Sequence, residues 1–323
     1  MTESTLESNE IDLLLARMRS RFIAYPAYTD LQVKFDNLLS KRRTEIELGL
    51  RGEAQGIAVI GASGSGKSTI VERLLSRHPG LQRPGQSNEI AETVELLIPS
   101  PATLKHVGLT MLTALGYTLK RDRPAAYIWD QVRHFLKLRK TLFIHLDEAQ
   151  DLYGATRAMR QDSAVNTLKT LMNRKDWPVG LILSGTPELA RLINSDVQLM
   201  RRLYVVILPA VSWATHPKEI TIIFQGYLAE AGLEADGDLD LKDFLPRLIH
   251  AGMNQFGIIL NLLLDGVEEA LRAEDCTVTI QHYAEAYRRK VSCPPSLNPF
   301  LAADWRAIDP SRIHDLCPEG DDI

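Results

Sequence analysis

The sequence has few cysteines, no long apolar run and no excess of one charge, and each absence narrows the possible functions. Cys276, Cys293 and Cys317 are widely spaced among 323 residues, so they form neither a metal-binding pattern nor an even set of disulfides. This usage is typical of a reducing compartment, and we expect a cytoplasmic protein. No stretch of about 18 apolar residues occurs, which argues against contact with a membrane through a spanning helix.

The charges of the two signs nearly balance. The 37 lysines and arginines stand against 41 aspartates and glutamates, for a net charge of −4. A protein that coats nucleic acid through a globally basic surface is therefore not indicated, and any contact with nucleic acid must come from local patches. The hydrophobic fraction of 45% is that of an ordinary globular protein.

What the sequence does contain is a complete phosphate-binding pattern, G-x-x-x-x-G-K-[ST], at residues 61–68. A short β-branched run at residues 57–60 precedes it and predicts a buried parallel strand, and a helix is expected from Ser68 to Arg77. Glycines let backbone N–H groups approach phosphate oxygens, Lys67 can reach the β- and γ-phosphates, and the Ser68 hydroxyl can ligate Mg²⁺. The residues predicted to bind the nucleotide are Gly61, Ala62, Ser63, Gly64, Ser65, Gly66, Lys67, Ser68 and Thr69.

An acidic pair follows a second apolar run. Residues 142–146 predict a buried strand, and Asp147 and Glu148 stand at its carboxyl end. Asp147 can hold Mg²⁺, directly or through water, and Glu148 can polarise the attacking water as a general base. The other interpretation is a solvated acidic loop over residues 147–151. Beside a complete phosphate-binding loop, the pair favours an ATPase that uses ATP and Mg²⁺.

Apolar runs alternate with helical patterns over the first two thirds of the chain. Strands are expected at residues 57–60, 94–98, 142–146, 179–183 and 204–208. This alternation predicts an α/β fold with a five-stranded parallel sheet covered on both faces, and after residue 215 the pattern is helical only. The expected domains are an N-terminal helical extension at 1–48, an α/β nucleotide-binding core at 49–212, a small helical lid at 213–290 and an extended tail at 291–323.

Two segments outside the core have two interpretations each. Residues 11–22 predict a basic amphipathic helix, which either packs on the core domain or serves as a DNA-binding arm. Asn298-Pro299-Phe300 lies in the tail, and it either docks a partner or belongs to a solvated, disordered end.

Five strands, a polar end to the fourth strand and a helical lid together resemble the AAA+ ATPases. In that family the fourth strand ends in a sensor that reads the γ-phosphate, which implies Thr186, with Ser184 as the alternative; Ser-Gly-Thr-Pro is also good turn chemistry. The family presents an arginine finger to a neighbouring subunit just before the fifth strand, which implies Arg202 first and Arg201 second. A surface arginine paired with Asp196 is the other interpretation.

The lid departs from the AAA+ pattern in one respect. That family usually carries a sensor arginine in a G-x-x-R-type segment of the lid. Residues 252–263 contain no arginine, and the next one along the chain is Arg272. The resemblance therefore implies slow hydrolysis.

Several shorter segments resemble the TniB/TnsC-like transposition regulators over residues 20–300. They are Phe22-Ile23-Ala24-Tyr25-Pro26, Leu96-Leu97-Ile98-Pro99-Ser100-Pro101, Asp147-Glu148-Ala149-Gln150, Asn166-Thr167-Leu168-Lys169-Thr170-Leu171-Met172-Asn173, Ser184-Gly185-Thr186-Pro187-Glu188-Leu189 and Asn298-Pro299-Phe300. The resemblance implies subunits that bind ATP and assemble head-to-tail on double-stranded DNA as a ring or helical filament. The assembly would recruit a transposase, interact with a target-selection protein and disassemble when ATP is hydrolysed.

The family contacts the DNA backbone largely without reading sequence. By position, the resemblance implies Thr103 and Lys105, then Arg157 and Arg160, each of which can also be a plain surface residue. Two other functions remain open. One is an AAA+ ATPase that acts on protein partners in secretion or defence, and the other is a nucleotide-binding scaffold without useful hydrolysis.

Overall fold

The computed structural model describes residues 8–50, 52–82, 90–100, 102–154, 166–167 and 169–313 of the chain. The chain divides into two compact units, an α/β unit and a helical unit. The α/β unit comprises Ala24–Ser63 and Lys67–Pro209, and the helical unit comprises Met1–Ile23, Gly64–Gly66 and Ala210–Ile323. None of the described helices combines the length and the apolar composition that a membrane crossing requires.

The α/β unit is built on a five-stranded sheet in the order β2-β3-β4-β1-β5, and every pair of neighbours is parallel. This confirms the predicted fold class. Short β-branched and apolar runs form the central strands because both of their faces are covered. The strands are β1 (Gly56–Ile60), β2 (Thr93–Leu97), β3 (Phe143–Asp147), β4 (Gly180–Gly185) and β5 (Leu203–Ile207).

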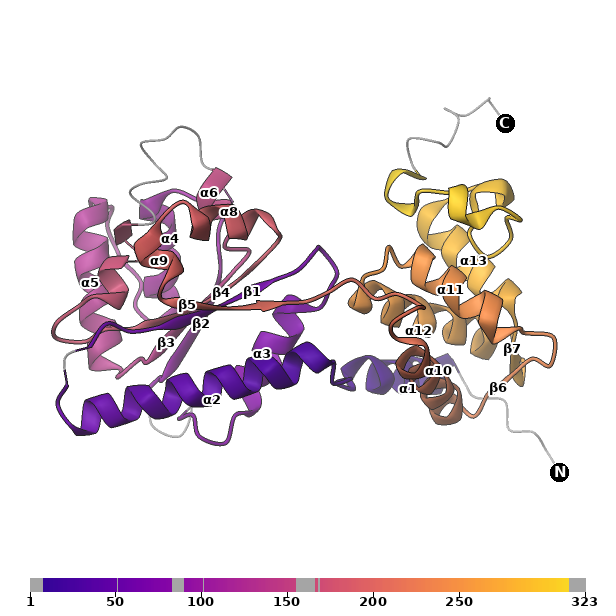
Figure 1. The fold of residues 1–323 in the computed structure, drawn as a ribbon, viewed down its shortest axis with the longest axis horizontal. Coiled ribbons are helices and arrows are strands. Elements are labelled where there is room, and N and C mark those ends of the chain that lie inside the picture. Colours follow the sequence, from indigo (N-terminus) through magenta and orange to yellow (C-terminus); the bar gives the residue numbers. More distant parts are fainter. Residues whose placement is uncertain are drawn as a thin grey trace. The chain divides into compact units, whose positions relative to one another are not determined.

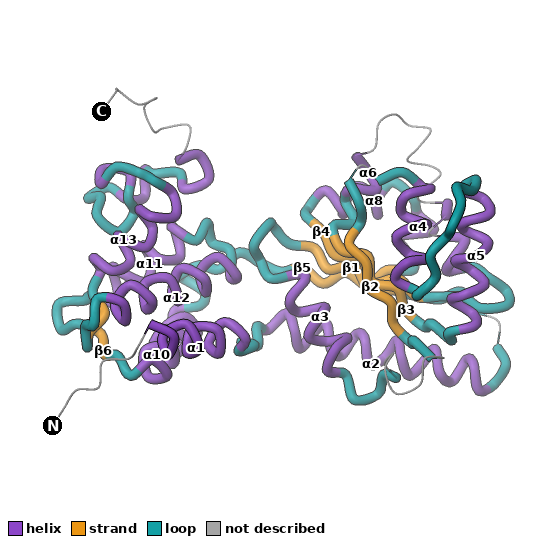
Figure 2. Tube along the Cα trace, turned by 180° about the vertical axis from the view of Figure 1, so that it is seen from behind, coloured by secondary structure: helices purple, strands orange, loops and turns teal. Residues whose placement is uncertain are grey.

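Helices cover both faces of the sheet, with α2 and α3 on one face and α4 and α5 on the other (Figure 1, Figure 2). The apolar faces of α4 and α5 bury leucine, valine, isoleucine and methionine side chains in one core cluster against the strands, and α2 and α3 bury their own apolar side chains as well. The described helices of the α/β unit are α2 (Pro26–Glu47), α3 (Lys67–Arg77), α4 (Leu104–Ala114), α5 (Ala125–Leu138), α6 (Asp151–Gly154), α8 (Glu188–Asn194) and α9 (Val197–Met200).

The strand register brings the polar strand ends to one edge of the sheet. Ile60, the last residue of β1, pairs with Gly185 of β4 on one side and with Ile207 of β5 on the other. Asp147, the last residue of β3, pairs with Leu97 of β2. Because the strands are parallel, their carboxyl ends meet where an open α/β sheet places its ligands.

The helical unit contains α1 (Ser8–Ser20), α10 (Pro217–Ala231), α11 (Leu241–Ala251), α12 (Phe256–Arg272) and α13 (Ile280–Val291). The prediction that this region is helical only was wrong at two places. Glu234–Ala235 (β6) and Thr277–Val278 (β7) form a parallel two-stranded ladder. Two residues are too few to show the alternation of a strand in the sequence.

Helix α1 packs within the helical unit, against α12 and α10. Its apolar stripe, Ile11, Leu15 and Met18, is buried. Arg19 of this helix pairs with Glu268 at 2.9 Å, and Arg21, just after the helix, pairs with Glu230 at 2.8 Å. Of the two interpretations of this segment, the structure therefore supports a packing helix, although the surface that receives it is not the core domain.

Residues 292–313 are folded, whereas the sequence suggested an extended tail over 291–323. Phe300, Trp305, Ile308 and Ile313 are buried, and three short 3₁₀ turns, Pro295–Leu297, Trp305–Ala307 and Pro310–Arg312, shape the segment. Asn298 is also buried, donating from Nδ2 to the Ala284 carbonyl at 2.8 Å and accepting from the Phe300 N–H at 3.0 Å. Asn298 and Phe300 thus belong to the core, although they were expected either to dock a partner or to be solvated. The prolines around them do not prevent this packing, since proline is compatible with a packed coil.

Candidate nucleotide-binding site

The loop between β1 and α3 has the backbone that a phosphate-binding loop needs. Gly64 and Gly66 adopt positive φ angles of 76° and 92°, which only glycine reaches without strain. No atom lies within 4 Å of the position that a Cβ would take at Gly66, so the loop leaves open space there. The Gly61 N–H donates to the Gly185 carbonyl at 3.2 Å and ties the loop to β4.

Lys67 begins α3 with its side chain folded back across this loop. Its Nζ donates to the Ala62 carbonyl at 2.9 Å, and the residue is only 5% exposed. Burial lowers the pKa of the Lys67 ammonium, and the negative charges of Glu148 and Asp147 oppose that change. An ammonium group carries three N–H donors, so it can bind phosphate oxygens while it keeps the loop contact.

Asp147 is held by hydroxyl groups at the end of β3. Ser184 Oγ donates to Asp147 Oδ1 at 2.5 Å, and the Glu148 N–H donates to the same oxygen at 3.0 Å. Burial would raise the pKa of Asp147, but hydrogen bonds from Ser184, Ser68 and the Glu148 backbone keep it below its usual value. The carboxylate is therefore ionised and oriented toward the first turn of α3.

A buried histidine, His145, contacts the serine that holds Asp147. His145 Nε2 lies 2.8 Å from Ser184 Oγ, and its Nδ1 lies 3.3 Å from a carboxylate oxygen of Glu95 on β2. The single Ser184 hydroxyl proton goes to Asp147, so His145 must donate to Ser184. Ser184 thus supports Asp147, which leaves Thr186 as the residue at the β4 end for the predicted sensor.

Glu148 and Thr186 are connected through Gln150. The Glu148 carboxylate accepts a hydrogen bond from Gln150 Nε2, and Gln150 Oε1 accepts one from the Thr186 N–H at 3.0 Å. The Thr186 hydroxyl donates to Glu188. From the sequence, Gln150 was named only as part of the segment Asp147-Glu148-Ala149-Gln150 and was assigned no role, because nothing in that segment shows that it reaches Thr186.

The residues present fit a nucleotide with Mg²⁺. The Ser68 hydroxyl is near enough to Asp147 to help lower the pKa of its carboxyl, so a hydroxyl and a carboxylate lie side by side. Among the described residues, Ser65 Oγ is buried without a hydrogen-bond partner, so its hydroxyl can donate a hydrogen bond to an anion. In the same part of the chain no three His, Cys, Asp or Glu side chains gather around a metal position. Mg²⁺ commonly takes one or two protein ligands and obtains the rest from phosphates and water.

The two arginines before β5 differ sharply in exposure. Arg202 is 3% exposed and pairs with Glu53, with 2.8 Å between Arg202 Nη2 and Glu53 Oε1. The side chain of Arg201 is 59% exposed and reaches Glu53 only at 3.2 Å. Asp196, offered as the partner of a surface arginine, instead pairs with Lys169 at 2.7 Å. A finger must leave its own subunit, so exposure ranks Arg201 ahead of Arg202.

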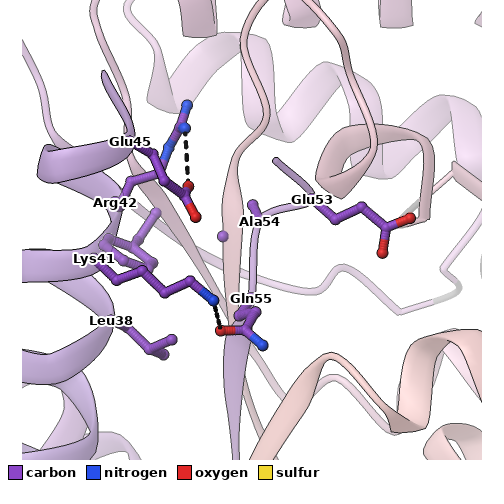
Figure 3. Close-up of a pocket in the computed structure, with 9 residues that line it drawn as sticks. Leu38, Lys41, Arg42, Glu45, Glu53, Ala54 and Gln55 are labelled. Atoms are coloured by element: carbon purple, nitrogen blue, oxygen red, sulfur yellow. Dashed lines mark hydrogen bonds and ion pairs between the residues drawn. The ribbon is translucent and has the colours of Figure 1, made fainter. Parts of the chain in front are cut away.

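Glu53 also borders a small cavity under α2. The cavity holds about 10 Å³, room for a single water, and is lined by Leu38, Lys41, Arg42, Glu45, Glu53, Ala54, Gln55, Phe143 and Gly180. Figure 3 shows Lys41 against Gln55, and the Glu53 carboxylate directed away from both. This cavity is too small for a ligand, and Glu53 serves the arginines instead.

The predicted DNA contacts occupy the start of α4. The Thr103 side chain caps α4 by accepting from the His106 N–H at 3.2 Å, and Lys105 pairs with Asp122 at 2.5 Å. Asp122 belongs to an exposed basic loop that was not predicted, Lys120-Arg121-Asp122-Arg123. A run of three cations in four residues is a visible signal in the sequence. Arg157 and Arg160 lie outside the described residues.

The lid arginine that the AAA+ pattern requires has no substitute at Arg272. This side chain pairs with Glu268 of α12 and Asp12 of α1, both at 2.7 Å. Arg272 therefore fixes α1 to α12 inside the helical unit. The departure seen in the sequence remains in the structure.

Comparison with known proteins places this geometry in a family. The model of the family described as "Bacterial TniB protein" matches residues 15–213. No curated protein matches the chain.

Solved structures share the fold at low sequence identity. The ORC1 protein of Aeropyrum pernix in complex with DNA has a TM-score of 0.62 at 16% identity, over 90% of this chain and 75% of that chain. Cdc6p of Pyrobaculum aerophilum has a TM-score of 0.56 at 14% identity, over 88% and 75%. The Aeropyrum pernix ORC2 protein in ADPNP–ADP complexes has a TM-score of 0.54 at 15% identity, over 78% and 66%. The fold is that of the AAA+ ATPases.

Proposed function

This chain belongs to the TniB family of bacterial proteins, and from that premise we propose that it is an ATP-dependent, DNA-binding regulator of transposition. The observation that carries the proposal is the convergence of Lys67, Asp147 and Glu148 at one edge of the sheet. Lys67 is the charge that meets phosphate, and Glu148 is the base. Thr186, at the end of the neighbouring strand, is the proposed sensor of the γ-phosphate.

ATP hydrolysis follows from the proposed roles. Glu148 orients a water against the γ-phosphorus and takes its proton as the bond to the bridging oxygen breaks and ADP leaves. Lys67 and the loop N–H groups neutralise the charge on the phosphates. Ser68 and Asp147 would hold Mg²⁺, which would supply positive charge to the phosphates when bound. With no arginine in residues 252–263, we expect this step to be slow.

Assembly is proposed to complete the site. Arg201, with Arg202 and Glu53 behind it, is the proposed finger for a neighbouring subunit's nucleotide. Several apolar side chains close to Arg201 in the sequence are exposed on α9 and on the edge strand β5, as interface residues are; they are Val197, Met200, Tyr204, Val205 and Ile207. Strand β5 is an edge of the sheet, so a second copy can approach it without displacing a strand. A head-to-tail contact of this kind closes into a ring or continues as a helical filament.

Double-stranded DNA is the proposed surface on which the subunits assemble. The pair between Lys105 and Asp122 joins the start of α4 to the exposed basic loop after it, so the proposed surface consists of Thr103, Lys105, Lys120, Arg121 and Arg123. Such a surface binds phosphates without reading sequence, and released counterions make the binding weaker in salt. The DNA-bound assembly would recruit the transposase and respond to a target-selection protein.

The proposal is tested by electron microscopy of the protein with DNA and a non-hydrolysable ATP analogue, each alone and together. Rings or filaments that require both support it. Oligomers that form with nucleotide and ignore DNA would favour an ATPase that acts on protein. The Glu148→Gln variant with ATP should lower ATP turnover about 100-fold and accumulate on DNA. If its assemblies dissociate as fast as those of the wild type, hydrolysis does not control disassembly.

A further inference from the structure

The loop after β3 contains a glutamine that touches both the proposed base and the end of β4. Gln150 Oε1 must face the Thr186 N–H, because a backbone N–H can only donate. Its Nε2 therefore faces Glu148, where it donates to Oε2. The Thr186 N–H and the Glu148 carboxylate thus fix which end of the amide is the oxygen and which is the nitrogen.

The end of β4 is shaped to admit this side chain. A Cβ at Gly185 would lie 2.4 Å from Gln150 Oε1, closer than atoms approach without a shift. Gly185 is a regular strand residue without a positive φ. Its lack of a side chain is therefore needed for space beside Gln150, and not for backbone freedom.

Glu148 needs support because its backbone is unfavourable. Its φ of 52° lies in the left-handed region that non-glycine residues seldom adopt. The Asp151 N–H donates to the Glu148 carbonyl at 3.0 Å, and the Ala149 N–H donates to the Ser184 carbonyl at 2.9 Å. These bonds fix the backbone of the loop, but only Gln150 is seen to fix the Glu148 carboxylate among the described residues.

We propose that Gln150 is a positioning residue for ATP hydrolysis, which holds the Glu148 carboxylate and joins it to the β4 end that carries Thr186. The inference rests on the proposed ATPase function. One carboxylate oxygen is occupied by the amide, and the other is left to accept the proton of the attacking water. Because the amide also holds the Thr186 N–H, a shift of the sensor moves the base.

The test compares Gln150→Ala with Gly185→Ala. The first removes the amide, and the second displaces it without changing its chemistry. Each should lower kcat about tenfold while the Kd for ATP changes less than twofold, because neither change removes a hydrogen bond of the loop that binds phosphate: alanine at position 185 keeps the carbonyl that accepts from the Gly61 N–H. The double variant should be no slower than the slower single variant. Gln32→Ala, the same change at an exposed position of α2, should leave kcat and Kd unchanged.

A second measurement separates positioning from folding. In the Glu148→Gln background, Gln150→Ala should cause no further loss, since the carboxylate that it positions is gone. The proposal is overturned if Gln150→Ala leaves kcat unchanged, if ATP affinity falls as far as kcat, or if the Gly185→Ala loss adds fully to it. Absence of ATP turnover in the wild type, with and without DNA, would instead overturn the proposed function.

Discussion

The α/β unit and the helical unit place their polar groups differently. Apart from Ser65 and Asn298, the buried polar and charged side chains of the described residues lie in the α/β unit; they are Arg42, Lys67, His78, Glu92, Thr141, His145, Ser184 and Arg202. The helical unit instead keeps its ion pairs at the surface, as Arg288 and Glu285 do. Buried polar groups are costly unless they are paired, and three of those in the α/β unit, Lys67, His145 and Ser184, belong to the candidate nucleotide-binding site.

The core of the helical unit contains a cluster of aromatic rings, whereas the α/β unit buries polar side chains. Phe300 packs beside Phe244, Tyr283 and Tyr287, with ring centroids 5.8 to 6.1 Å apart. Burial raises the pKa of the Tyr283 hydroxyl far above its usual value, which indicates how dry this cluster is. The stability of the two units should therefore respond to different kinds of substitution.

The largest effect is expected from Phe300→Ala. Removing this buried ring should lower the free energy of unfolding of the helical unit by about 3–5 kcal/mol. Hydrogen exchange followed by mass spectrometry should show lost protection in α11 and α13. Leu301→Ala, at an exposed neighbouring position, is the control and should cost little. Unchanged protection in the Phe300 variant would mean that residues 292–313 do not pack on this unit in solution.

A smaller effect is expected from Ser184→Ala in the α/β unit. The change leaves His145 Nε2 and Asp147 Oδ1 without their shared hydroxyl, and an unsatisfied buried group costs about 1–3 kcal/mol. Ser20→Ala in α1 removes an exposed hydroxyl that donates to a local carbonyl, and it should cost less than about 0.5 kcal/mol. Denaturant titrations of the two variants give the comparison. Equal costs would show that the network around Asp147 contributes nothing specific to stability.

The smallest effect is expected from Asp176→Asn, and it depends on pH. Hydrogen bonding to Arg174 lowers the pKa of Asp176 to about 2, from an ordinary value of 3.8. A carboxyl whose pKa is lower in the folded state stabilises the protein above the unfolded pKa, and this contribution disappears as pH falls from about 4 to about 2. Solvent screens the exposed pair, so the loss at neutral pH should stay below about 1 kcal/mol. Thermal unfolding at pH 7 and near pH 2 should show a difference only at the higher pH.

The sheet was predictable because each of its strands appears in the sequence as a short, continuous apolar run. Each β-branched run falls within one or two residues of an observed strand, and a buried parallel strand needs little more than such a run. The polar residues at the strand ends could likewise be placed at a common edge, since parallel strands all end there. The role of Ser184 under Asp147 could not be read in this way, because it depends on the lateral register of β3 and β4.

The features that the sequence could not place have physical causes of the same kind. Arg201 and Arg202 are adjacent and alike in sequence, and only the turn before β5 decides which is buried against Glu53. Asn298 and Phe300 were expected either to dock a partner or to be solvated, because prolines interrupt every periodic pattern around them. The role of Gln150 could not be predicted from the segment that contains it, since Glu148 and Thr186 are brought together by tertiary structure alone.

The strand order also governs how the protein is made. Strand β1 pairs with β4 and β5, whose residues 180–185 and 203–207 leave the ribosome long after residues 56–60. Helix α1 likewise packs against α12, so its apolar stripe stays uncovered until residues 256–272 have been synthesised. Neither the phosphate loop nor α1 can pack in its final position early in translation, because the elements they pack against, β4, β5 and α12, lie far away in sequence. Nascent chains stalled before residue 203 should therefore fail to bind nucleotide and should depend on chaperones.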